Sequence, residues 1–265
     1  MRIFISADIE GVTTTTTHEE CNSTSPLYPR HAEQMTKEVL AVVEGAFAAG
    51  ATEIVIKDAH GSGMNIDPTK MPENVILQRN WTGHPYLMVE GVDKSFDAAM
   101  FVGYHSSAGK PGNPLSHTKT GKSAYIKLNN RFASEFMIYS WACALEGVPS
   151  VFLSGDKMLC DDEAELHPSL ISVATKDGLG SITRNYSTVT TMRSLREKSE
   201  QALKQNLSAA KIVLPDSFEL EVFYKDQGEA ERASHYPGAV KVSSNIVTFK
   251  HDCYYEVLRA IKWIV

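Results

Sequence analysis

Two acidic residues separated by a single position are the first candidates for chemistry in this sequence. Asp8 and Glu10 follow the apolar residues 3–5, and Gly11 comes directly after them. Residues at positions i and i+2 of a strand point to the same side, so the two carboxylates are expected to lie next to each other. Neighbouring carboxylates repel each other unless a cation or a proton lies between them. The pair therefore indicates either a metal site or a solvated acidic loop.

Histidines follow two later segments that are predicted as strands. His60 comes after residues 53–57, and His105 comes after residues 98–102. The carboxyl ends of parallel strands meet at one edge of a sheet, where ligands bind. Carboxylates and imidazoles together favour Zn, Mn, Fe or Ni over Ca or Mg. Either histidine alone is also compatible with a structural role, and Asp58 is expected either to orient His60 or to cap its strand.

Glu135 and His117 extend this set of candidates. Glu135 is the only charged residue between positions 132 and 145, a segment predicted as a buried helix. A buried carboxylate must be paired or bound to a metal, although an anion at an exposed helix start is also stabilised by the helix dipole. His117 follows a loop rich in glycine and proline, which makes it either a proton shuttle or an exposed loop histidine.

The candidate ligands are too numerous for one catalytic metal ion. They are Asp8, Glu10, His60, His105 and Glu135. A single catalytic zinc usually takes fewer ligands from the protein, so five ligands fit two metal ions. A carboxylate, most simply that of Asp8, would then bridge the two ions. Residues 18–20 could add ligands, but a solvated loop is the favoured interpretation of that segment.

The elements that must position these side chains are predicted as an α/β fold. Strands are predicted over residues 2–6, 53–57, 98–102 and 150–154, helices over 31–49 and 133–145, and residues 170–175 are a candidate fifth strand. This alternation predicts a mostly parallel, doubly wound sheet with helices on both faces. After about residue 190 the pattern changes to a charged helix, three short strands and a final helix. We therefore expect a metal-binding catalytic domain over residues 1–190 and a smaller C-terminal α+β domain over residues 191–265.

Composition narrows the class of protein and its surroundings. The 265 residues are 43% hydrophobic and 22% charged, as in an ordinary globular protein. The net charge of -6 argues against a nucleic-acid partner. No apolar run is long enough to span a membrane, and the N-terminus lacks the pattern of a signal peptide. The four widely spaced cysteines predict free thiols and hence a cytoplasmic protein, and the lack of a membrane-spanning run predicts that a membrane is not a partner.

These motifs together resemble the DppA-type D-aminopeptidases, metallopeptidase family M55. The matching segments are 8–12, 35–39, 58–61, 103–105, 117–118, 135, 147–149, 155–156, 229–231 and 237–238. They span nearly the whole chain, in the same order and with similar spacing. Each segment alone is a weak signal, and the set as a whole is specific.

The resemblance implies a function that the spacing alone does not establish. It implies a metallo-aminopeptidase that removes the N-terminal residue of short peptides, notably D-amino acid peptides, by means of a metal-bound hydroxide. It implies two Zn²⁺ per subunit, with other divalent metals as alternatives. The implied ligands are Asp8, Glu10, His60, His105 and Glu135, with Asp8 bridging, and His117 is the implied catalytic residue. It also implies a homo-oligomer, in the form of a decameric ring.

Two other functions stay open at this point. The same pair of metals could hydrolyse another amide or a phosphoester, although the sequence contains no Gly-rich phosphate loop. The chain could also be a non-catalytic homologue that binds a metal or another ligand. It departs from the family pattern at residues 13–14, at Asn130 and at Ser134. We expect these departures to lie at the mouth of the site and to affect substrate identity more than metal chemistry.

Overall fold

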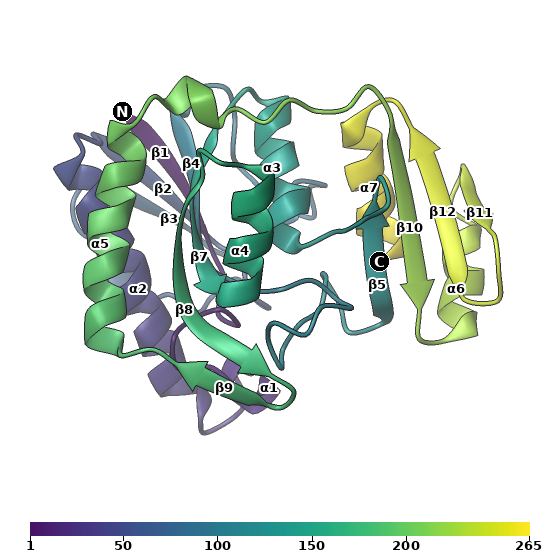
Figure 1. Ribbon diagram of the computed structural model, residues 1–265, viewed down its shortest axis with the longest axis horizontal. Helices are drawn as coiled ribbons and strands as arrows, with labels where there is room; N and C mark the ends of the chain where they lie inside the picture. The colour runs from purple at the N-terminus through teal and green to yellow at the C-terminus, as the bar shows by residue number, and fades with distance from the viewer.

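A seven-stranded sheet forms the larger part of the computed structural model, which describes residues 1–265 (Figure 1). Its strand order is β3-β2-β1-β4-β7-β8-β9, and every neighbouring pair is parallel except β8 and β9. The strands are β1 (Arg2–Ala7), β2 (Glu53–Asp58), β3 (Val75–Gln78), β4 (Ala98–Tyr104), β7 (Ser150–Asp156), β8 (Ile171–Leu179) and β9 (Ile182–Asn185). The predicted doubly wound sheet is thus confirmed.

Helices cover both faces of this sheet, which explains why its central strands are almost entirely apolar. In Figure 1, α2 (Tyr28–Ala48) and α5 (Thr188–Lys204) lie on one side, and α3 (Glu135–Leu145) and α4 (Lys157–Leu166) lie on the other. Successive residues of β1 point to opposite faces, as strand geometry requires. Ile3 and Ile5 pack in the core beneath α2 and α5, whereas Phe4 packs in the core beneath α3.

A second, antiparallel sheet has the strand order β11-β12-β10-β5-β6. Its strands are β5 (Ser123–Leu128), β6 (Arg131–Phe132), β10 (Phe218–Tyr224), β11 (Ala239–Lys241) and β12 (Ile246–His251). Two helices, α6 (Gln227–Ser234) and α7 (Tyr254–Ile264), pack on this sheet, and α7 also packs against α3. The remaining elements are α1 (His18–Cys21) and three short 3₁₀ helices, η1 (Pro68–Lys70), η2 (Leu87–Val89) and η3 (Leu207–Ala210).

The chain therefore crosses between the two sheets more than once. Strands β5 and β6 come from the middle of the chain but pair in the smaller sheet. Helix α5, which begins at Thr188, packs on α2 of the larger sheet. The division into domains at residue 190 stays a prediction.

The site lies where the order of strands in the larger sheet reverses. Strand β1 has β2 on one side and β4 on the other, so the connections leave it in opposite directions. Such a switch point opens a crevice at the carboxyl ends of the strands. The loop that follows β1 touches the end of β4 there, and the Gly11 amide donates a hydrogen bond to the Gly103 carbonyl, with 2.8 Å between nitrogen and oxygen. A Cβ atom on Gly11 would lie only 1.8 Å from the Tyr104 carbonyl oxygen, so this approach requires glycine.

All four cysteines are free; Cys253 is exposed and the other three are buried. None of the helices combines the length and the apolar character that crossing a membrane requires.

Candidate metal centre

The five predicted ligands converge on the crevice at the switch point. Asp8 and Glu10 follow β1, and His60 and His105 follow β2 and β4. Glu135 is the first residue of α3, which begins beside the same edge. Four of the five side chains are almost completely buried, and His60 is half-buried at a cleft of about 380 Å³. Loops from separate strands therefore place five metal-binding side chains in one site.

The Asp8 carboxylate lies between the two imidazoles. Its Oδ1 atom is 3.2 Å from His60 Nδ1, and its Oδ2 atom is 3.6 Å from His105 Nε2. Glu10 Oε2 is 3.0 Å from the same His60 nitrogen. On the other side, Glu135 Oε2 is 3.5 Å from His105 Nε2. Each oxygen of Asp8 thus faces a different imidazole, and each imidazole has a second carboxylate beside it.

These contacts form two groups, each able to hold a metal ion, that share Asp8. One group contains Asp8, Glu10 and His60, the other contains Asp8, His105 and Glu135, and within each group the candidate ligand atoms lie within 4.8 Å of one another. Two buried atoms in these groups, Glu10 Oε2 and His105 Nε2, make no hydrogen bond. Burial of a polar atom without a partner costs about 1–3 kcal/mol. The residues therefore fit a pair of metal ions, which would supply the missing partners.

The electrostatics of the centre also favour cations. Burial raises the pKa of Asp8 well above its usual range, and the neighbouring Glu10 carboxylate is the second largest cause of this increase. Burial opposes protonation of His105, yet the Glu135 carboxylate raises the pKa of this histidine to about 10. Without a metal ion, protons on the buried groups must offset the three carboxylate charges. Divalent cations would perform the same task more completely.

Hydrogen bonds outside the cluster fix the tautomers of the His60 and His105 imidazoles. His60 Nε2 lies 3.0 Å from the Cys21 carbonyl oxygen, and His105 Nδ1 lies 2.9 Å from the Ser106 carbonyl oxygen. A carbonyl oxygen only accepts, so each of these nitrogens must donate. The remaining nitrogen of each ring, Nδ1 of His60 and Nε2 of His105, faces the carboxylates. Such outer contacts are typical of metal-binding histidines.

Asp58 has a capping role and does not orient His60. Its carboxylate accepts hydrogen bonds from the backbone amides of Asn65 and Ile66, with donor–acceptor distances of 2.5 and 2.7 Å. It makes no hydrogen bond to His60. Asp58 therefore caps the loop after β2, and the Cys21 carbonyl orients His60 instead.

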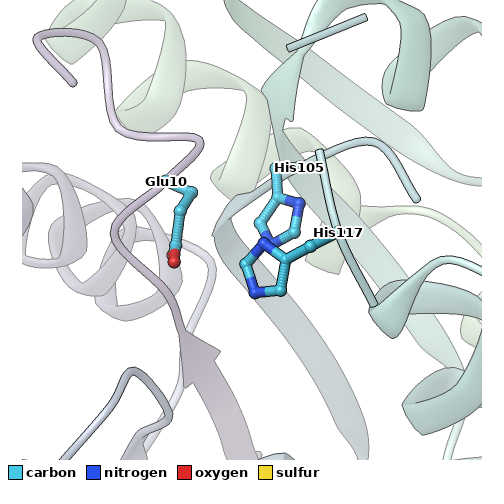
Figure 2. Close-up of side chains that lie close together, drawn as sticks. All are labelled: Glu10, His105 and His117. Carbon is cyan, nitrogen blue, oxygen red and sulfur yellow. The ribbon is translucent and has the colours of Figure 1, made fainter. Parts of the chain in front are cut away.

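His117 lies beside the cluster and is half-buried. Its Nδ1 atom donates to the Leu115 carbonyl oxygen at 2.8 Å, and its Nε2 atom is 3.7 Å from Glu135 Oε1. Its ring stacks on that of His105, with centroids 4.4 Å apart and 22° between the planes. Figure 2 shows these two rings facing Glu10 across the site. His117 thus presents an unprotonated Nε2 atom to the cleft whenever its ring is neutral.

A dense set of hydrogen bonds holds the loop that carries Glu10. Lys176 Nζ donates to the Glu10 carbonyl oxygen at 2.9 Å and to Thr15 Oγ1 at 2.6 Å. Thr15 Oγ1 in turn lies 2.9 Å from the carbonyl oxygen of Ile9, and the Thr13 amide donates to Glu38 Oε1 at 3.0 Å. The threonine run is therefore an ordered turn. Glu20 accepts from the Thr16 and Thr17 amides, so it does not join the metal cluster.

The three departures from the family pattern do not line the cleft, so the expectation that they lie at its mouth is wrong. Asn129 and Asn130 have φ angles of 48° and 65° in the tight turn between β5 and β6, a conformation that asparagine tolerates. Ser134 caps α3 by accepting from the Met137 amide at 2.9 Å. Residues 13–14 belong to the hydrogen-bonded turn after Glu10. All three serve local backbone structure.

Sequence reasoning missed several other residues that line the cleft. They are Trp81, Leu87, Met88, Lys119 and Tyr139. Trp81 Nε1 donates to the Gly61 carbonyl oxygen at 2.8 Å. Trp81 follows β3, a strand that the sequence analysis did not predict. If this short strand had been predicted, the rule that parallel strands end at one edge of the sheet would have placed Trp81 near the site.

The doubly wound sheet and the buried cluster of carboxylates and imidazoles together define the class, an α/β metallohydrolase. Comparison with known families makes the assignment specific. The chain belongs to the Peptidase M55 family, described as D-aminopeptidase, whose model matches residues 1–263. The predicted enzyme class, a metallopeptidase, is confirmed.

Two similar proteins cover nearly the entire chain. A D-aminopeptidase of Bacillus subtilis (strain 168) is 28% identical over 264 residues, which is 98% of this chain and 95% of the relative. The solved structure of the Zn-dependent D-aminopeptidase DppA from Bacillus subtilis, described as a self-compartmentalizing protease, superposes with a TM-score of 0.93. That alignment covers 100% of this chain and 96% of the other, at 27% sequence identity.

Proposed function

We propose that this protein is a dizinc aminopeptidase that removes the N-terminal residue of short peptides, with D-amino acid peptides as substrates. The observation that carries the proposal is the position of Asp8, whose two oxygens face His60 and His105 at 3.2 and 3.6 Å. A carboxylate shared between two ligand groups is the arrangement that a bridged pair of metals requires. The zinc dependence of the similar Bacillus subtilis structure supports zinc as the metal.

The ligands divide into two sets under this proposal. Glu10 and His60 would hold one ion, His105 and Glu135 would hold the other, and Asp8 would be a ligand of both. When bound, zinc lowers the pKa of a water molecule and polarises the scissile carbonyl group. The carboxylates keep the two sites close together, and the hydrogen bonds from the imidazoles to Cys21 and Ser106 keep the rings in place.

His117 supplies the proton acceptor in this mechanism. Its Nδ1–H bond to Leu115 leaves Nε2 free to take a proton at the edge of the cleft. The Glu135 carboxylate, 3.7 Å from that nitrogen, stabilises the imidazolium that results. The proton can then pass to the amine of the leaving peptide.

The preference for D-residues and the assembly are carried over from the family. The similar proteins are named D-aminopeptidases, and one of them is described as self-compartmentalizing. We accordingly propose a homo-oligomer, a decameric ring, in which access to the cleft is restricted to short peptides. The four free cysteines are consistent with the reducing cytoplasm proposed as its location.

Metal analysis combined with hydrolysis of matched substrates tests the proposed function. We expect two zinc ions per chain and faster release of alanine from D-alanyl-D-alanine than from L-alanyl-L-alanine. A phosphoester such as p-nitrophenyl phosphate serves as the control for a different hydrolase. One metal ion per chain, or turnover of the phosphoester with neither dipeptide cleaved, would contradict the proposal.

A further inference from the structure

Lys119 is the only lysine or arginine in the lining of the metal cleft. It lies two residues after His117, and its φ angle of 63° turns the chain sharply there. Its backbone amide donates to Glu135 Oε1 at 2.6 Å. The residue is thereby fixed beside the candidate metal centre, and its side chain is the one lysine side chain in the cleft lining.

The side chain of Lys119 is held in place but is not neutralised. Its Nζ atom donates to the carbonyl oxygens of Ile261 and Lys262, at 2.9 and 3.0 Å, near the end of α7. An ammonium group has three N–H bonds, so one donor remains. No carboxylate lies within ion-pair distance of Lys119, whereas the nearby Lys122 pairs with Glu229 at 2.9 Å. The cleft therefore contains a partly buried positive charge that lacks a counterion.

The surroundings of Lys119 suit a small anion rather than a protein carboxylate. Lys262 contributes a second ammonium group near the cleft wall, since a Cβ atom on Gly83 would lie 3.2 Å from its Nζ atom. The Trp81 ring, which also lines the cleft, is fixed by its bond to Gly61 and by the Lys57 ammonium group, 3.9 Å from the ring centroid. The lining of the cleft thus combines the Lys119 ammonium group with the apolar side chains of Leu87 and Met88.

We propose that Lys119 binds the free C-terminal carboxylate of the substrate, which makes the site selective for peptides that end one residue beyond the scissile bond. This inference rests on the proposed function. A dipeptide bound with its scissile carbonyl at the metal ligands has its carboxylate about one residue length, ~3.8 Å, further along the chain. Lys119 lines the same cleft as the candidate metal ligands, so its remaining N–H donor is available to that carboxylate. A charge-assisted hydrogen bond in a partly buried site gives both affinity and register.

The test compares a dipeptide with its C-terminal amide. Wild-type protein is expected to favour D-alanyl-D-alanine over D-alanyl-D-alaninamide by about 10-fold to 100-fold in kcat/KM. Lys119→Met is expected to lose that preference, through a higher KM for the free acid, with the amide affected less than about twofold. Lys119→Gln, which keeps a donor for the α7 carbonyls, distinguishes loss of charge from loss of structure. Lys122→Met removes a charge three residues away and is the matched control.

A binding measurement separates this inference from the proposed function. The probe is an alanyl-alanine analogue with a reduced, uncleavable peptide bond, prepared as free acid and as amide and titrated calorimetrically into the zinc-loaded protein. Preferential binding of the acid by wild type, lost in both Lys119 variants but not in Lys122→Met, supports the inference even if no peptide is hydrolysed. Equal binding of acid and amide by wild type, or a preference that survives in Lys119→Gln, overturns it.

Discussion

The rings of His105 and His117 stack with their centroids 4.4 Å apart; both histidines lie in one group of candidate ligands with Glu10, but only His105 is also grouped with Asp8. His105 is fixed by its bond to the Ser106 carbonyl, and His117 by its bond to the Leu115 carbonyl. The stack therefore connects a buried ligand to a half-buried imidazole that reaches the cleft. This relationship separates two roles that the sequence alone does not distinguish.

Replacement of His117 should remove catalysis and leave the metals in place. We expect His117→Ala to lower kcat by about 10²–10⁴-fold, the usual contribution of a positioned acid or base. The zinc content should stay at the wild-type value, because His117 is outside the shared Asp8 groups. Metal analysis and dipeptide turnover on the same sample provide the measurement. His235→Ala, at the exposed position that follows α6, is the control; zinc loss in His117→Ala would show a structural role instead.

Asp8 and Glu10 should differ in the number of metal ions that their removal releases. Asp8 belongs to the group that contains His60 and to the group that contains His105 and Glu135. Of these two groups, Glu10 belongs only to the one that contains His60. Asp8→Ala is therefore expected to empty the centre, and Glu10→Ala to leave one ion per chain. Zinc counted after dialysis against a weak chelator distinguishes these results. Equal stoichiometry in the two variants would rule out a bridging Asp8.

The strands that end at the metal site could be anticipated from sequence, and with them the ligands that follow each strand. The apolar runs that end before Asp8, His60 and His105 are buried on both faces, so their pattern is continuous and easy to recognise. Glu135 was identified for a related reason, as the one charge in an apolar helix. In each case the local composition of the segment shows that it is buried, and burial identifies the strand or the charged residue.

Long-range pairing explains what could not be anticipated. Strand β5 pairs with β10, and Lys127 lies opposite Glu221, far away in the sequence. Nothing in either short strand identifies its partner, so β5 and β6 escaped prediction. Lys176 and Lys119 were missed for the same reason. Their ammonium groups contact backbone carbonyl oxygens, and because every residue has one, the sequence does not show which carbonyl a lysine contacts. Helix α4 carries many charged residues and buries only a narrow side, so its few apolar residues do not show a clear helical periodicity in the sequence.

Gly11 should be among the least replaceable residues of the chain. A Cβ atom there would overlap the Tyr104 carbonyl, so Gly11→Ala must push apart the loop after β1 and the end of β4. We expect a loss of about 3 kcal/mol or more in the free energy of unfolding, together with weaker zinc binding. Gly121→Ala is the control, because a Cβ atom at that position meets nothing within 4 Å. Urea denaturation of both variants measures the difference, and similar midpoints would contradict the close approach.

Glu163 should make the stability of the protein depend on pH in a predictable direction. Its carboxyl group is buried, accepts from Ser134 Oγ at 2.9 Å, and leaves Oε2 without a hydrogen bond. Burial raises the pKa of Glu163 from 4.5 to about 7. Between these values the folded chain retains a proton that the unfolded chain has lost, so stability falls as pH rises through this window. Below it both states are protonated, and above it the full cost of the buried charge remains.

Glu163→Gln should remove this dependence, because the amide resembles the protonated carboxyl group and carries no charge. Relative to wild type, the variant is expected to gain up to about 3 kcal/mol in unfolding free energy between pH 4.5 and pH 8. Urea denaturation at a series of pH values gives the comparison. Glu165→Gln, which removes an exposed carboxyl group from the same helix, is expected to follow wild type throughout. A constant difference between Glu163→Gln and wild type across the series would show that Glu163 does not titrate in this window.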